Sequence, residues 1–75
     1  MPPPRFVTFV ERSGTDADAR LATLAARLRG EGATVRLLRS REQTGLALIV
    51  VEGDPALTPD DVADARVWRF EETGS

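Results

Sequence analysis

Seventy-five residues, of which 41% are apolar, suffice for one small domain, and a chain of this size buries only about 60% of its unfolded surface. The chain has no cysteine, which excludes disulfides, thiolate catalysis, zinc knuckles and iron–sulfur ligation. Its net charge of −2 argues against a general nucleic-acid binder, which normally carries a basic excess.

The chain contains no apolar run of the roughly 18 residues that a membrane span needs. Its first residues, MPPPRF, lack the basic start and apolar middle of a signal peptide. We therefore expect no membrane partner, and the absence of cysteine fits a cytoplasmic location. We expect one domain over residues 1–75, with an extended lead-in at 1–4 and a flexible tail at 72–75.

The first two predicted elements are a strand and a long helix. The stretch RFVTFVE, residues 5–11, is aromatic and β-branched, which predicts a strand with apolar side chains on both faces. Thr15 and Asp18 resemble a capping box, and Gly30 or Gly32 can provide a left-handed helix end. Between them, a stripe of apolar residues at helical spacing predicts the helix: Ala17, Leu21, Leu24, Ala25 and Leu28.

Two more strands follow. Residues 33–41 alternate between apolar and polar side chains, which predicts a half-exposed strand with Val35 and Leu37 on one face. Residues 46–52 are apolar through Val51, which is typical of a strand that is buried on both faces.

A short helix and a last strand complete the chain. Thr58 can cap a helix, Pro59 suits its first position, and acids in the first turn favour its N-terminus, but only about two turns follow. Residues 66–72 predict a strand with Trp68 and Phe70 on one face.

The element order and the apolar content of the strands predict the fold. The first and third strands are apolar throughout, whereas the second and fourth carry arginines, as edge strands do. The expected strand order is therefore 4-1-3-2, an α+β, ferredoxin-like split β-α-β fold with a four-stranded antiparallel sheet. The crossover at residues 53–65 has room for only a short helix, so one full helix and one short helix should cover one face.

The opposite face of this sheet should have no helix. Large side chains on the central strands would then form an apolar patch bigger than a monomer normally exposes. We predict that a partner covers it and that the interface comprises Phe6, Thr8, Val10, Leu46, Leu48, Val50, Trp68 and Phe70. The alternative is that these positions are only partly exposed and need no partner.

Candidate catalytic and metal-binding groups are sparse. The densest carboxylates match no calcium loop and are explained by helix capping and solubility: Asp54, Asp60, Asp61 and Asp64. Ser13 and Ser40 have no histidine or lysine to activate them, so we interpret both as turn residues. Arginines on the edge strands would suggest RNA binding only beside aromatic residues on both central strands. We expect no enzyme, metal, cofactor or nucleic-acid partner.

The order of elements, from RFVTFVE through the helix to TGLALIVVE and DARVWRFEE, resembles that of the subtilisin propeptide (inhibitor I9) family. The positions that match its pattern are Gly45, Asp64, Val67, Glu71 and Glu72. The resemblance implies that the helix-free sheet face packs on a protease and that the tail, residues 71–75, enters the active-site cleft.

We therefore expect a non-enzymatic module that associates through the open face of its sheet, either as a homodimer or with a partner protein. One alternative is a propeptide-like protease inhibitor, as the resemblance implies. Another is an ACT-like small-molecule regulatory domain, in which Arg36 or Arg39 meets an anionic group at a dimer edge.

Overall fold

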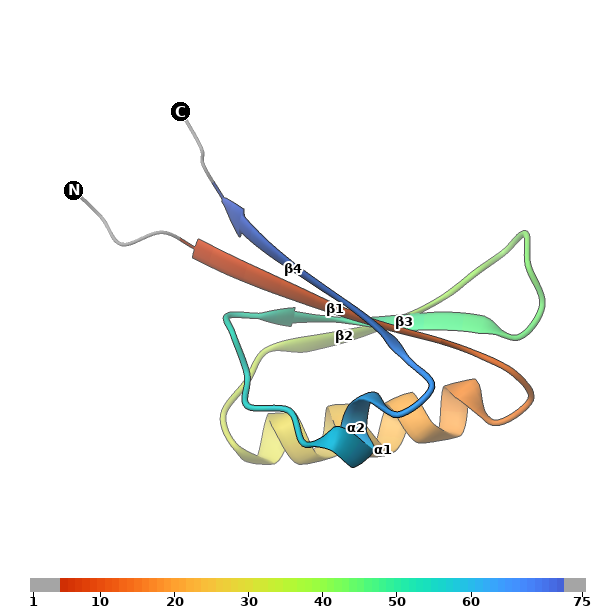
Figure 1. Cartoon of the computed structure of the whole chain (residues 1–75), viewed down its shortest axis with the longest axis horizontal. Coiled ribbons are helices and arrows are strands. Elements are labelled where there is room, and N and C mark those ends of the chain that lie inside the picture. Colours follow the sequence, from red (N-terminus) through yellow and green to blue (C-terminus); the bar gives the residue numbers. More distant parts are fainter. Residues whose placement is uncertain (1–4, 73–75) are drawn as a thin grey trace.

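The sheet of this protein has four antiparallel strands, and both helices lie on the same side of it (Figure 1). The structure, a computed structural model, describes residues 5–72. Its elements are β1 (Arg5–Ser13), α1 (Ala17–Gly30), β2 (Val35–Arg39), β3 (Leu46–Glu52), α2 (Pro59–Val62) and β4 (Arg66–Glu72).

The strands are arranged in the order β2-β3-β1-β4, which is 4-1-3-2 when it is read from the β4 edge. The two apolar strands, β1 and β3, lie side by side in the centre, and the arginine-bearing strands form the edges. Pairing in this register brings the first residue of β1, Arg5, opposite the last residue of β4, Glu72. Glu72 is thus part of a strand and not of the tail predicted for 72–75. The predicted lead-in at 1–4 lies outside the described residues.

The hydrophobic core lies between α1 and the sheet. The predicted apolar stripe of α1 is buried, which confirms the helix and its inward face. Leu21 and Leu28 of α1 pack with Val10 of β1 and with Ile49 and Val51 of β3, and each of these side chains is fully buried. The core therefore lies mainly between the two central strands and α1, and Val35 of β2 also belongs to it.

The start of α1 differs from the prediction. The helix begins at Ala17, its N-cap is Asp16, and no side chain caps it, so the expected capping box of Thr15 and Asp18 is wrong. The reason is that the chain already turns at Gly14, whose carbonyl accepts from the Ala17 N–H at 3.3 Å, which leaves Thr15 before the cap.

The end of α1 is the predicted left-handed glycine. Gly32 has φ +96°, and the next residue, Ala33, donates its N–H to the Leu28 carbonyl at 2.9 Å. Gly30 is still helical. Of the two candidate glycines, Gly32 therefore ends the helix.

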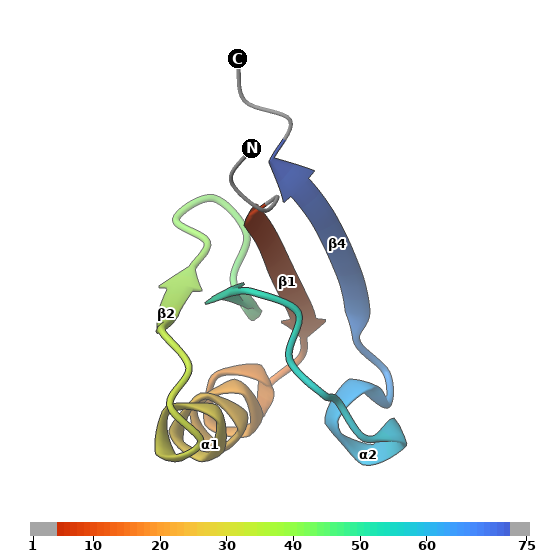
Figure 2. The same cartoon turned by 90° about the vertical axis from the view of Figure 1, so that its left-hand side faces the viewer.

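The crossover between β3 and β4 contains the short helix α2. Thr58 and Asp61 form a reciprocal capping box, in which the Thr58 N–H donates to Asp61 Oδ2 at 2.8 Å. The helix has four residues, one turn and not the expected two, because Ala63 leaves the helical region and Asp64 takes φ 58° to turn into β4. No residue of α2 is buried. In Figure 2, α1 lies below the β2 side of the sheet and α2 below the β4 side.

Candidate functional site

The side of the sheet opposite the helices has a defined set of side chains. Val10 and Ile49 are paired and buried under α1, so the residues next to them in each strand point to the other side. We call this helix-free surface the open face. It comprises Arg5, Val7, Phe9, Glu11 and Ser13 of β1, Arg36 and Leu38 of β2, Leu46, Leu48, Val50 and Glu52 of β3, and Arg66, Trp68, Phe70 and Glu72 of β4.

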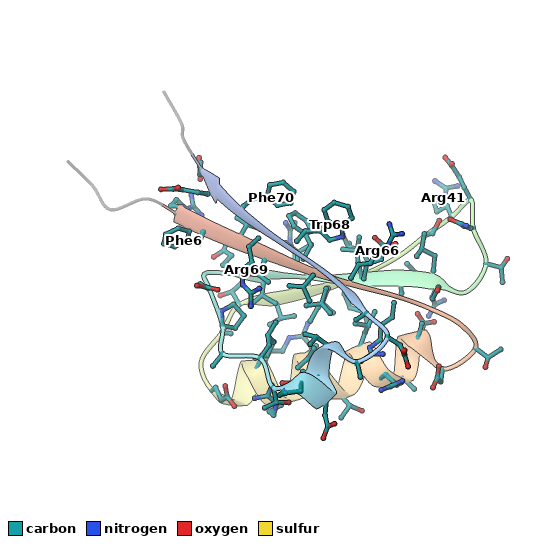
Figure 3. All side chains as sticks on the ribbon, in the orientation of Figure 1. Phe6, Arg41, Arg66, Trp68, Arg69 and Phe70 are labelled. Atoms are coloured by element: carbon teal, nitrogen blue, oxygen red, sulfur yellow. The ribbon has the colours of Figure 1, made fainter. Side chains whose placement is uncertain are left out.

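Three residues of the predicted interface are on the wrong side. Val10 is 0% exposed in the core beneath α1, and Thr8 is 1% exposed and donates from Oγ1 to the Gly53 carbonyl at 2.9 Å. Phe6 shares their side of β1 (Figure 3). Because both faces of β1 are apolar, alternation shows which residues share a face but not which face the helix covers. The residues of β1 on the open face are the other set, which includes Val7 and Phe9.

The other five predicted residues lie on the open face: Leu46, Leu48, Val50, Trp68 and Phe70. Figure 3 shows Trp68 and Phe70 pointing away from the helices and Arg69 pointing toward them. Trp68 is 44% exposed and Phe70 53%, whereas Val50 is only 7% exposed. The exposed apolar surface is therefore concentrated on β4 and not on the central strands.

Sequence reasoning missed Leu38, which is 46% exposed on the open face at the β2 edge. It also missed Val7 and Phe9, which are half-buried and, with Phe70, line a shallow hollow of about 430 Å³. The alternation of Val35 and Leu37 toward the core implied that Leu38 lies on the opposite face.

The residues of the open face form rows across the strands. From β4 to β2, one row is Trp68, Phe9, Val50 and Arg36, and the next is Arg66, Glu11, Leu48 and Leu38. On the other side of the Trp68 row lies the row of Phe70, Val7 and Glu52. Beyond it, Glu72 and Arg5 form the last pair at that end of the sheet. An apolar band therefore crosses the sheet between two charged ends.

The two charged ends of the open face differ in sign. At one end, Arg5 lies 3.6 Å from both Glu52 and Glu72, which leaves one negative charge in excess. In the row at the other end, the charges of Arg66 and Glu11 cancel, and Arg36 in the Trp68 row gives this half of the face one positive charge in excess. The open face thus has an electric polarity along the strand direction.

The residues considered for catalysis take structural roles. Ser40 Oγ accepts from the N–H groups of Glu42 and Gln43, at 3.2 and 3.0 Å, which confirms it as a turn residue. Ser13 is the last residue of β1 and not a turn residue. Within residues 5–72, no three carboxylates are grouped closely enough to hold a metal ion.

Several acids outside the open face form ion pairs with arginines. Asp54 pairs with Arg69 at 3.1 Å, Asp18 pairs with Arg39 at 2.9 Å, and Asp61 pairs with Arg27. Arg39 is thereby held at the helix side of the sheet, away from the open face. Glu71 and Glu72, which the family resemblance assigned to a tail, belong to β4.

No family model matches this chain, and no curated protein or solved structure is similar enough to it to count as a match. Among residues 5–72, no helix is long and apolar enough to cross a membrane. The geometry of the open face is therefore the main indication of function.

Proposed function

We propose that this protein is a ferredoxin-like, non-enzymatic module that forms a homodimer by packing the open faces of two copies against each other. The observation that carries this proposal is the apolar band, in which Trp68, Phe70 and Leu38 are each at least 44% exposed on a face without helices. Exposed aromatic residues in a contiguous apolar patch are typical of protein interfaces.

The ferredoxin-like assignment is supported by the element order and by the 4-1-3-2 arrangement of the strands. In this arrangement both crossovers carry their helices to one side, so the other side of the sheet is left for a partner. Without a partner, the apolar side chains of that second side would remain in water, which costs roughly 25 cal/mol of free energy for each Å² of exposed apolar surface.

The charges of the open face favour a second copy as the partner. A two-fold axis that runs across the strands reverses the strand direction, so the acidic end of one copy faces the basic end of the other. Glu72 would then lie opposite Arg66 of the second copy, and Trp68 opposite Phe70 of the second copy. A two-fold axis along the strands would instead oppose ends of like charge.

Sedimentation velocity over a dilution series tests this proposal, and the single tryptophan of the chain provides a second signal. We expect a species of twice 8.2 kDa at high concentration. Tryptophan emission should shift to the red on dilution, because Trp68 leaves the interface for water.

A matched pair of variants locates the interface. Leu38 and Leu37 are neighbours on β2 with similar exposure, 46% and 40%, but only Leu38 is on the open face. Leu38→Glu should abolish the dimer, whereas Leu37→Glu should leave it intact. Circular dichroism of both variants controls for folding.

Two outcomes would overturn the proposal. One is a protein that is monomeric at all concentrations, and the other is equal loss of the dimer in both leucine variants. Inhibition of a subtilisin-type protease by that monomer would support the family resemblance instead. A metabolite that raises the melting temperature of a dimer at the β2 edge would favour the regulatory alternative.

A further inference from the structure

Arg12 is a buried charge on the helix side of the sheet. Its side chain is 5% exposed, and its Nη2 donates to the main-chain carbonyl of Asp61 at 3.0 Å. Arg12 forms no ion pair with any acid of residues 5–72. A guanidinium has five N–H donors, so one contact with a neutral carbonyl leaves both its charge and most of its donors uncompensated.

The uncompensated groups of Arg12 border a cavity. This cavity has a volume of about 310 Å³ and lies between α1 and α2, with Arg12 of β1, Arg20, Thr23, Leu24 and Arg27 of α1, and Asp60 and Asp61 of α2 in its lining. Among the described residues, no fully buried side-chain nitrogen or oxygen lacks a hydrogen-bond partner. The remaining guanidinium nitrogens of Arg12 therefore reach accessible space, and the cavity supplies it.

The lining has a net positive charge, from three arginines and two aspartates. Asp61 is already engaged, because its Oδ2 accepts from the Thr58 N–H and pairs with Arg27. Arg20 lies one helical turn before the lining residues Thr23 and Leu24 and forms no ion pair with an acid of the described residues. Arg12 and Arg20 thus provide the positive charge that the lining acids do not neutralise.

We propose that this cavity binds an oxyanion, a phosphate or carboxylate group of a small molecule, with Arg12 and Arg20 as its ligands. Arginine donors bind such groups through charge-assisted hydrogen bonds, which are strongest when the guanidinium is shielded from water, as that of Arg12 is. The site lies on the helix side of the sheet and is independent of the open face.

The competing explanation is that Arg12 only anchors α2 through the Asp61 carbonyl. The two explanations differ in the effect that they predict for the charge of Asp60 on anion binding. Asp60 lines the cavity and is exposed, so it repels an anion there but contributes nothing to the anchor. Removal of the Asp60 charge should therefore strengthen anion binding, and this test leaves Arg12 and its hydrogen bond to the Asp61 carbonyl in place.

The experiment is a titration of the full chain with inorganic phosphate and, separately, with acetate, followed by ¹H–¹⁵N chemical shifts. Sodium chloride keeps the ionic strength constant. We expect saturable shifts at Arg20 and Asp61 with at least one of the two anions, and the comparison shows whether phosphate or carboxylate is preferred. Arg20→Gln should weaken binding about fivefold, and Asp60→Asn should tighten it by a similar factor.

Arg41 provides the matched control, because it is an exposed arginine in the β2–β3 loop and does not line the cavity (Figure 3). Arg41→Gln removes the same charge and should not change binding. Shifts that never saturate, or equal weakening in Arg20→Gln and Arg41→Gln, would overturn the site. The same titration on monomeric Leu38→Glu separates this result from the fate of the dimer.

Discussion

The ring of Phe9 meets the ring of Phe70 edge to face, with centroids 5.4 Å apart and ring planes at 85°. The two residues come from a central and an edge strand, β1 and β4, and lie on the open face. Such an aromatic pair stabilises by about 0.5–1.5 kcal/mol beyond the area that it buries. It therefore holds β4 to the sheet before any partner binds.

Phe70→Leu should destabilise the monomer by about 1 kcal/mol, because leucine keeps apolar area but loses the edge-to-face contact. Urea denaturation at the lowest usable concentration measures this value. Phe6→Leu is the control, because Phe6 is 45% exposed on the other side of β1 and is not part of the aromatic pair. Equal losses in the two variants would contradict a specific role for the pair.

Thr8→Val should destabilise the protein by about 1–2 kcal/mol. Valine has the same shape, but it removes the hydrogen bond from Thr8 Oγ1 to the Gly53 carbonyl within a site where Thr8 is 1% exposed. Thr23→Val removes a comparable bond, to the Ala19 carbonyl at 3.0 Å, on the exposed surface of α1. That variant should change the unfolding free energy by less than about 0.5 kcal/mol. Thermal and urea unfolding give both values.

Gly30 and Gly32 should respond in opposite directions to alanine. An added Cβ meets nothing within 4 Å at either position, so only the backbone distinguishes them. Gly30 is helical, and Gly30→Ala should stabilise by about 0.5–1 kcal/mol. Gly32 has φ +96°, and Gly32→Ala should destabilise by at least about 1 kcal/mol. Equal effects in denaturant unfolding would show that α1 does not end at Gly32.

Arg66 and Glu72 test the orientation of the proposed dimer. Arg66→Glu and Glu72→Arg should each weaken dimerisation several-fold, because each opposes like charges across the interface. The double variant should recover most of the affinity, in a double-mutant cycle measured by sedimentation. A rise in salt should reduce these effects by screening the exposed charges. Additive losses in the double variant would exclude the axis that runs across the strands.

Much of this fold is predictable because its local signals agree. The bounds of β3 and β4 follow from a continuous apolar run and from an alternating one, and the Thr58–Pro59 start of α2 follows from its capping chemistry. Which face of β1 is buried cannot be predicted from local signals. Residues 6–10 carry apolar side chains in both directions, so only the packing of α1 determines that Val10 is buried and Phe9 is not.

The cavity at Arg12 could not be predicted from the sequence either, because it also depends on tertiary packing. The sequence predicts a first strand over residues 5–11, so Arg12 falls outside it. In the structure β1 continues, because Arg12 and Ser13 pair with Ala47 and Leu46 of β3. The burial of Arg12 then depends on α2, whose contact residue Asp61 is 49 positions away. No local pattern carries that information.

The polar attachment of α2 has a consequence for local motion. This helix buries none of its residues, and its ties to the rest of the protein include the Arg12–Asp61 hydrogen bond and the Arg27–Asp61 ion pair. Because few apolar contacts would be lost, the turn can detach while the sheet and α1 stay folded. Its amide protons should exchange with solvent far faster than those of β3, and an anion bound at Arg12 would slow them.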